Sequence, residues 1–230
     1  NLRAQIRGLK QAVRNAQDGI SLVQVAEGSM NEISSILIRL RELAVQAASD
    51  TIGPVERQFL NVEYDQLVSE IDRISEGTEF NGTQLLAGVG SILDFQVGTR
   101  NNPEIDRISF DASKADANSA ALGVNLTSVA DKASAQNALA AVDQAIVSVS
   151  AMRADFGAIQ NRLSSTVSNI QVSVENMSAA NSRIRDVDIA EETSEMTRNN
   201  ILLQAGTSVL AQANQHANVA LGLLNKSFNG

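Results

Sequence analysis

The chain has 230 residues, of which 43% are hydrophobic but only 3% aromatic, and it carries a formal charge of −8. This acidic balance argues against a nucleic-acid-binding protein, and no run of about 18 apolar residues is present that could span a membrane. The absence of cysteine excludes disulfides, zinc–thiolate sites and cysteine nucleophiles. With so few aromatic residues, the core must be built from Ala, Val, Ile and Leu, which favours narrow contacts between rods.

The first predicted element is a very long helix over residues 2–49. Its apolar residues recur at steps of three and four, the spacing of a coiled-coil seam, and one repeated three-residue step shifts the phase. Gly8, Gly19 and Gly28 each weaken the helix by about 1 kcal/mol relative to Ala, so we expect neighbouring helices to pack closely there. The seam comprises Leu2, Ile6, Leu9, Val13, Ala16, Ile20, Val23, Ala26, Met30, Ile33, Leu37, Leu40, Ala44 and Ala47.

A second helix is predicted over residues 55–76, after a turn. Pro54 suits the first turn of a helix, where its missing N–H has no helical partner. Because the connection is short, we expect this helix to pack antiparallel on the first. Its predicted core residues are Phe59, Val62, Leu67, Ile71 and Ile74.

The periodicity then changes to that of strands. The dipeptide Asn81-Gly82 favours a turn, and apolar and polar residues alternate from 93 to 97. We expect a small β-hairpin region over residues 83–111, with a further strand at 105–110. The connecting segments 98–103 and 112–133 are expected to be a polar loop and a loop or short helix, respectively.

Helical periodicity returns over residues 135–180 and again over 187–224. The predicted fold class is therefore mainly α: an elongated antiparallel bundle of long helices with a small β-hairpin region, plus a separate C-terminal helix. The polar side of that last helix is rich in Ser, Thr, Asn and Gln rather than charge, which suits burial among copies of itself. Its apolar residues are Ile189, Met196, Leu203, Val209, Leu210, Leu221 and Leu224.

The sequence offers little for catalysis or metal binding. His216 is the only histidine, so neither a histidine metal site nor a Ser-His triad can be assembled around a second one. A group of carboxylates near the start of the last helix is explained by the helix dipole and lacks the spacing of a calcium loop. We therefore expect no enzyme, no cofactor and no metal. The carboxylates are Asp186, Asp188, Glu191 and Glu192.

One face of the first helix is basic. Arg3, Arg7, Lys10 and Arg14 follow one another at steps of four, three and four. No aromatic residues lie nearby to stack on bases, so a nucleic-acid surface is not indicated. We interpret these residues as a solvated face or as ion-pair partners for a neighbouring subunit.

Short motifs occur in a fixed order along both ends of the chain. The N-terminal half contains QIRGL at 5–9, RNAQDGISL at 14–22, RELAVQAA at 41–48, EIDRI at 70–74 and FNG at 80–82. The C-terminal half contains QNRL at 160–163, ENM at 175–177, SRIRDVD at 182–188, QAG at 204–206 and LAQANQ at 210–215. In this order the motifs resemble bacterial flagellin over nearly the whole chain, and least over residues 83–133.

The resemblance implies a structural subunit of the bacterial flagellar filament, extracellular, exported and polymerised by coiled-coil-like helix packing for motility. Residues 1–180 would form the flagellin rod domain and 187–230 the C-terminal filament-core helix. The implied partners are other flagellin subunits, an export chaperone at the C-terminal segment, and the filament cap and hook-junction proteins. The short middle implies a minimal form without the variable outer domains, and we expect the N-terminal core helix of the family to be missing too.

Many flagellins are sensed by a Toll-like receptor through the rod. The matching positions are Arg39, Leu43 and Glu63, whereas Ile38 stands where enteric flagellins commonly carry Gln. The same residues could instead serve subunit packing alone. An alternative to a filament subunit is a non-polymerising binding module, of which a protein joining hook to filament is the nearest kind, and an enzyme is a distant third.

Overall fold

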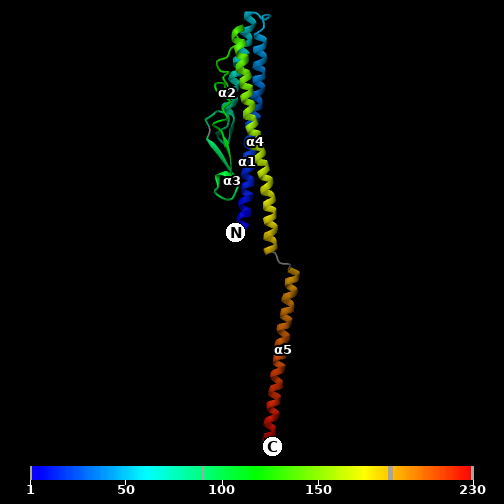
Figure 1. The fold of residues 1–230 in the computed structure, drawn as a ribbon. Coiled ribbons are helices and arrows are strands. Elements are labelled where there is room, and N and C mark those ends of the chain that lie inside the picture. The colour runs from blue at the N-terminus through cyan, green and yellow to red at the C-terminus, as the bar shows by residue number, and fades with distance from the viewer. Residues whose placement is uncertain (1, 90, 186–188, 229–230) are drawn as a thin grey trace. The chain divides into compact units, whose positions relative to one another are not determined.

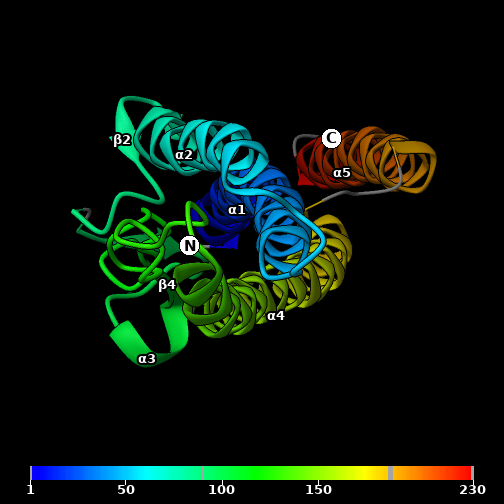
Figure 2. The ribbon, with the colours of Figure 1, turned by 90° about the horizontal axis from the view of Figure 1, so that it is seen from above.

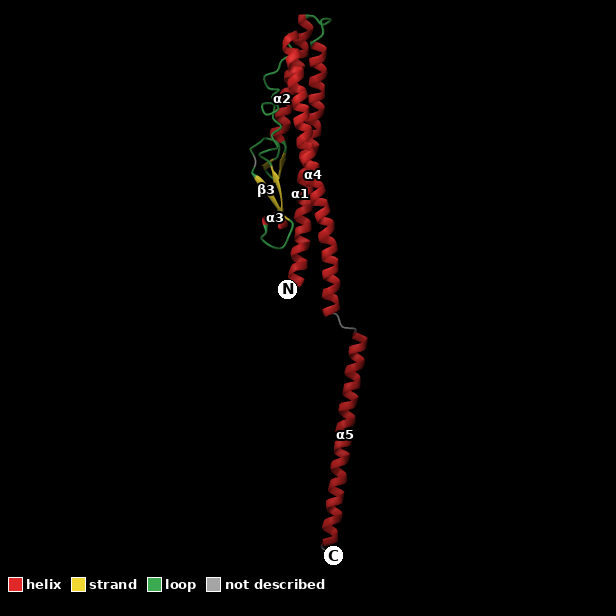
Figure 3. Ribbon diagram, in the orientation of Figure 1, coloured by secondary structure: helices red, strands yellow, loops and turns green. Residues whose placement is uncertain are grey.

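The computed structural model describes residues 2–89, 91–185 and 189–228, with their side chains apart from 185 and 216–228. Its elements are α1 (Leu2–Ala47), α2 (Pro54–Gly77), β1 (Glu79–Phe80), β2 (Thr83–Gln84), β3 (Ile92–Gln96), α3 (Pro103–Asp106), β4 (Arg107–Asp111), α4 (Lys132–Arg185) and α5 (Ile189–Phe228). Figure 1 traces them along the chain, and Figure 3 shows how strongly helix predominates. The predicted fold class, mainly α with small antiparallel strand pairs, is confirmed.

Contacts divide the chain into two compact units, Asn1–Met177 and Ser178–Gly230. Helix α4 continues without a break from Lys132 to Arg185, beyond the end of the first unit. In the first unit, viewed along the helices, α1 lies between α2 and α4, and the strands and loops lie to one side (Figure 2). The first unit is thus a bundle of long helices with a β-containing flank.

The heptad seam of α1 forms the centre of the first unit. From Ala16 to Ala47 its predicted residues are buried, except for Ile20, which is half-buried. Nearer the N-terminus the four seam residues are only half-buried, because α2 ends before it reaches them and α4 with the β3–β4 hairpin covers one side. Those four are Leu2, Ile6, Leu9 and Val13.

Helix α2 buries only part of the face that the sequence predicts. Phe59 and Val62 were expected inside, yet they are 70% and 62% exposed. Ile71 is fully buried as predicted, and Leu67 and Ile74 are half-buried against the core. Tyr64, which was not predicted in the core, is also fully buried, and its hydroxyl is 2.7 Å from Thr127 Oγ1. The prediction failed for Phe59 and Val62 because α2 has a second apolar stripe, and only packing against α1 and the 112–131 segment decides which stripe is covered.

The glycines of α1 meet different surroundings. A Cβ on Gly19 would lie 3.0 Å from Phe95 and 3.2 Å from Leu163, so a strand and a helix do approach closely there. At Gly8 the close neighbour is Thr99 in a loop, at 2.9 Å, rather than a helix. Around Gly28 nothing lies within 4 Å, so the expected close helix packing is wrong at that position.

The strands form two antiparallel pairs, β1–β2 and β3–β4. The first pair begins at Glu79, before the predicted start at 83, and turns through Asn81 and Gly82, both with positive φ. In the second pair Leu93 lies opposite Phe110, and Phe95 opposite Ile108. Residues 105 and 106, predicted as strand, belong to the short helix α3, which the Asn102 side chain caps by accepting from the Glu104 N–H.

The segment between β4 and α4 is irregular but firmly attached to α2. The Asp72 carboxylate accepts both the backbone N–H and the hydroxyl of Ser119, at 2.7 and 2.8 Å. Asn61 Oδ1 accepts the Ser128 hydroxyl and the Val129 N–H. These bonds satisfy loop backbone groups that face the helix, so a segment without regular structure still buries Leu122, Val124 and Val129.

Candidate subunit interface

Helix α5 carries large apolar side chains that are exposed within the described part of the chain. Ile189, Met196, Leu203 and Leu210 are spaced by seven residues, and each is between 60% and 74% exposed. Val209, also predicted on this face, is 64% exposed, whereas the side chains of Leu221 and Leu224 lie outside the described residues. A seven-residue apolar repeat is the seam of a coiled coil, so this face is shaped for another helix.

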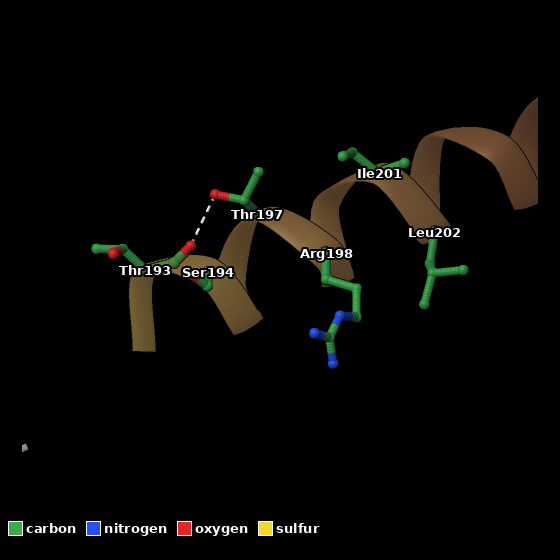
Figure 4. A pocket seen from close by; sticks show the side chains of 6 residues that line it. All are labelled: Thr193, Ser194, Thr197, Arg198, Ile201 and Leu202. Carbon is green, nitrogen blue, oxygen red and sulfur yellow. Dashed lines mark hydrogen bonds between the residues drawn. The ribbon is translucent and has the colours of Figure 1, made fainter. Parts of the chain in front are cut away.

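Other side chains near the start of α5 are exposed as well. Figure 4 shows a shallow depression formed by Thr193, Ser194, Thr197, Arg198, Ile201 and Leu202, all from this one helix. Thr197 donates its hydroxyl to the carbonyl of Thr193, so its polar group is satisfied within the helix. Ile201 and Leu202 are both at least 60% exposed, which extends the apolar surface beyond the heptad series.

A second exposed apolar stripe lies on α2. Val55, Phe59 and Val62 recur at the helical spacing of four and three and are 61–70% exposed. From the sequence, Phe59 and Val62 were expected in the core, so this stripe was not predicted as an exposed surface. Contiguous exposed apolar residues of this size mark surfaces that bind another macromolecule.

The three residues matched to receptor recognition are only partly together on the surface. Arg39 of α1 donates from Nε and Nη2 to Glu63 Oε1 of α2 at 2.9 and 2.8 Å, and from Nη1 to Glu42. These two carboxylates raise the pKa of Arg39 above its ordinary value, the Glu63 hydrogen bond being the largest cause. Leu43 is fully buried in the core, so it does not share the exposed surface of this pair.

Among the residues described, no group of His, Cys, Asp or Glu could hold a metal ion. Of the acidic group considered above, Glu191 and Glu192 lie in the first turn of α5, and Asp186 and Asp188 lie outside the described residues, as does the side chain of His216. In the described part of the chain no helix is long and apolar enough to cross a membrane. The surfaces that remain to be explained are the exposed apolar faces.

Comparison with known proteins identifies the family of the chain. The model of the bacterial flagellin N-terminal helical region matches residues 1–91, and that of the C-terminal helical region matches residues 139–224. A flagellin of Halalkalibacterium halodurans is 47% identical over 97% of this chain and 81% of its own. The chain belongs to the bacterial flagellin family. Flagellins are structural proteins of the extracellular flagellar filament, not enzymes, and this chain is a filament subunit.

Two further relatives agree with this assignment. This flagellin is 42% identical to the flagellar filament 33 kDa core protein of Treponema phagedenis, over 97% of this chain and 82% of that one. The crystal structure of Bacillus cereus flagellin superposes with a TM-score of 0.61 at 33% identity, covering 73% of this chain and 94% of that one. The resemblance first seen in short motifs is therefore confirmed along almost the whole flagellin chain.

Proposed function

We propose that this flagellin is exported and then polymerises outside the cell by coiled-coil-like helix packing, to build a filament used for motility. The observation that carries the proposal is the heptad face of α5, whose Ile189, Met196, Leu203 and Leu210 are all exposed in the single chain. Burying large apolar side chains is worth about 1.5–3 kcal/mol each. In this proposal residues 1–180 act as the rod and residues 187–230 as the helix that packs in the filament core.

Seeded assembly tests the proposal. Purified chain is added to short filament fragments, and polymer is measured by pelleting and electron microscopy. The double substitution Leu203→Asn and Leu210→Asn should abolish elongation, because it removes the centre of the heptad face. The matched control Gln204→Asn and Ser208→Asn alters polar residues outside the heptad series of the same helix and should elongate as wild type does. Wild-type chain that never elongates from seeds would refute the proposal.

The same face supports binding of an export chaperone before assembly. An apolar helix face held in a groove is a common mode of recognition. A chaperone bound to α5 would also prevent early polymerisation, since both partners need Leu203 and Leu210. Size-exclusion chromatography with light scattering should show a stable complex with wild type and none with the Asn double substitution. Contacts with the filament cap and hook-junction proteins are expected at the ends of the polymer.

Sensing by a Toll-like receptor is supported by a smaller surface. Arg39 and Glu63 are 46% and 44% exposed in their side chains and are held together in one orientation. Arg39→Ala should lower receptor signalling in a reporter-cell assay if this pair is a contact. Arg41→Ala is the matched control, since Arg41 is equally exposed on α1 but pairs with Asp143 of α4. Equal signalling by both variants would remove the receptor from the proposal.

A further inference from the structure

A groove lies between α1 and α4 near the start of α1. It has a volume of about 370 Å³ and is lined by Lys10, Val13, Arg14, Gln171, Val174 and Glu175. Val13 and Val174 supply apolar surface, and both are only half-buried. The groove is therefore an apolar recess that the chain itself leaves open.

The lining of this groove is basic on balance, since Lys10 and Arg14 outnumber the one carboxylate, Glu175. Four exposed cations, Arg3, Arg7, Lys10 and Arg14, precede the first acidic residue of the chain, Asp18. Within the described part of the chain none of the four makes an ion pair, and Arg14 bonds only to the neutral side chain of Gln11. A ligand for the groove should therefore be apolar at its centre and acidic around it.

The exposed stripe of α2 has those properties. Phe59 is the largest side chain of the stripe and is 70% exposed. Glu56 and Glu63 lie three and four residues from Phe59, on the same side of the helix. The whole of α2 carries six carboxylates against two arginines, a net charge of −4 that is opposite in sign to the cations at the start of α1.

Phe59 cannot reach the groove of its own chain. The Arg39–Glu63 bond places Glu63 beside Arg39, and Phe59 lies one helical turn further toward the connection between α1 and α2. Along α1, Val13 and Arg39 are about 40 Å apart at 1.5 Å per residue. Phe59 and the groove thus lie at different positions along the length of the first unit.

We propose that Phe59 of one copy inserts between Val13 and Val174 of a second copy, with Glu56 and Glu63 facing Lys10 and Arg14. This inference rests on the proposed polymerisation and names one contact within it. The two surfaces differ, so the contact is heterologous, and repeating it produces an open chain rather than a closed dimer. A single such contact is small, so it acts in the polymer and leaves dilute chains monomeric.

Disulfide trapping tests the contact directly, because the chain has no cysteine of its own. The variant Phe59→Cys with Val174→Cys is assembled on wild-type seeds, oxidised mildly and run without reductant. A ladder of covalent dimers, trimers and longer species is expected. Phe59→Cys with Val147→Cys, an exposed α4 residue outside the groove, is the control and should remain monomeric.

The outcomes separate this contact from polymerisation itself. Normal filaments without a ladder would overturn the contact and leave the proposed function standing. Covalent dimers from Phe59→Cys alone would also overturn it, because Phe59 would then meet its own counterpart. No filaments from wild type would overturn both proposals.

Charge reversal supplies an independent measurement. Lys10→Glu with Arg14→Glu should slow seeded elongation about tenfold or more, because like charges would then face each other across the contact. Adding Glu56→Arg to the same chain should recover much of the rate. Unfolding followed by Tyr64 fluorescence should be unchanged in both variants. A rate that falls equally with and without Glu56→Arg would contradict the assigned pairing.

Discussion

Helices α1 and α5 carry apolar residues at similar spacing, but of the two only α1 has these residues covered in the described part of the chain. Leu37 in the α1 seam is fully buried, whereas Leu203 in the α5 series is 70% exposed. The difference arises because α2, α4 and the β3–β4 hairpin cover α1. A heptad repeat thus indicates that a helix will be packed, and says nothing of whether the partner is the same chain or another one.

Core truncation should separate the two helices most clearly. Leu37→Ala should lower the free energy of unfolding by about 2–5 kcal/mol, because it leaves a cavity in the bundle. Leu203→Ala should change it by less than about 0.5 kcal/mol, because the side chain is exposed in the monomer. Urea unfolding followed by Tyr64 fluorescence measures both, since Tyr64 is the single tyrosine, the chain has no tryptophan, and Tyr64 lies in the first unit. Equal losses would mean that α5 is packed in the monomer.

The irregular segment of the first unit should depend on one carboxylate. Asp72→Ala should cost about 1.5–3 kcal/mol, because two donors on Ser119 lose a charged acceptor. Hydrogen exchange should also increase in residues 112–129 more than elsewhere. Glu76→Ala is the control, since Glu76 is an exposed carboxylate on the same helix and should cost much less.

Glycine substitutions should distinguish covered from open positions within α1 itself. Gly19→Ala should destabilise by about 1–3 kcal/mol, because its Cβ would meet Phe95 and Leu163. Gly28→Ala should instead stabilise by about 1 kcal/mol, because the space is open and Ala favours helix. The Tyr64 unfolding assay measures both. If Gly28→Ala also impaired assembly, the open space would be a place where a neighbouring subunit approaches.

Acid should have the smallest effect on stability. The effect should arise from carboxylates at the end of the bundle where α2 follows α1 and α4 begins. The Lys132 ammonium lowers the pKa of Asp50, and hydrogen bonds from Ser134 lower the pKa of Asp131. Because both pKa values are lower in the folded chain, their contribution is present above the unfolded value of about 3.9 and is lost as the pH falls through the folded values. Thermal unfolding at pH 5 and pH 3 should show a smaller decrease in Lys132→Met than in wild type.

Much of the fold could be predicted from the sequence because its signals are local. Long helical periodicity, in a chain with only two prolines, predicted the helices. Asn81-Gly82 predicted a turn, which the structure forms with both residues at positive φ. The short helix α3 was missed, because Ile105 continues an apolar alternation while Pro103 and the Asn102 cap favour a helical turn. At such short lengths the two patterns cannot be distinguished without neighbours.

By itself, the sequence determined that this is a flagellin of long helices, since periodicity and motif order are properties of the chain alone. Only the tertiary structure decided which stripe of α2 is buried, that Leu43 is buried while the Arg39–Glu63 pair is exposed, and that Phe59 and the groove at Val13 are too far apart to meet within one chain. The physical reason is that burial depends on which surfaces meet, and these surfaces come from segments distant in sequence. The α5 series shows the same dependence: its repeat is present in the sequence, but its exposure in the described part of the chain is seen only in the structure.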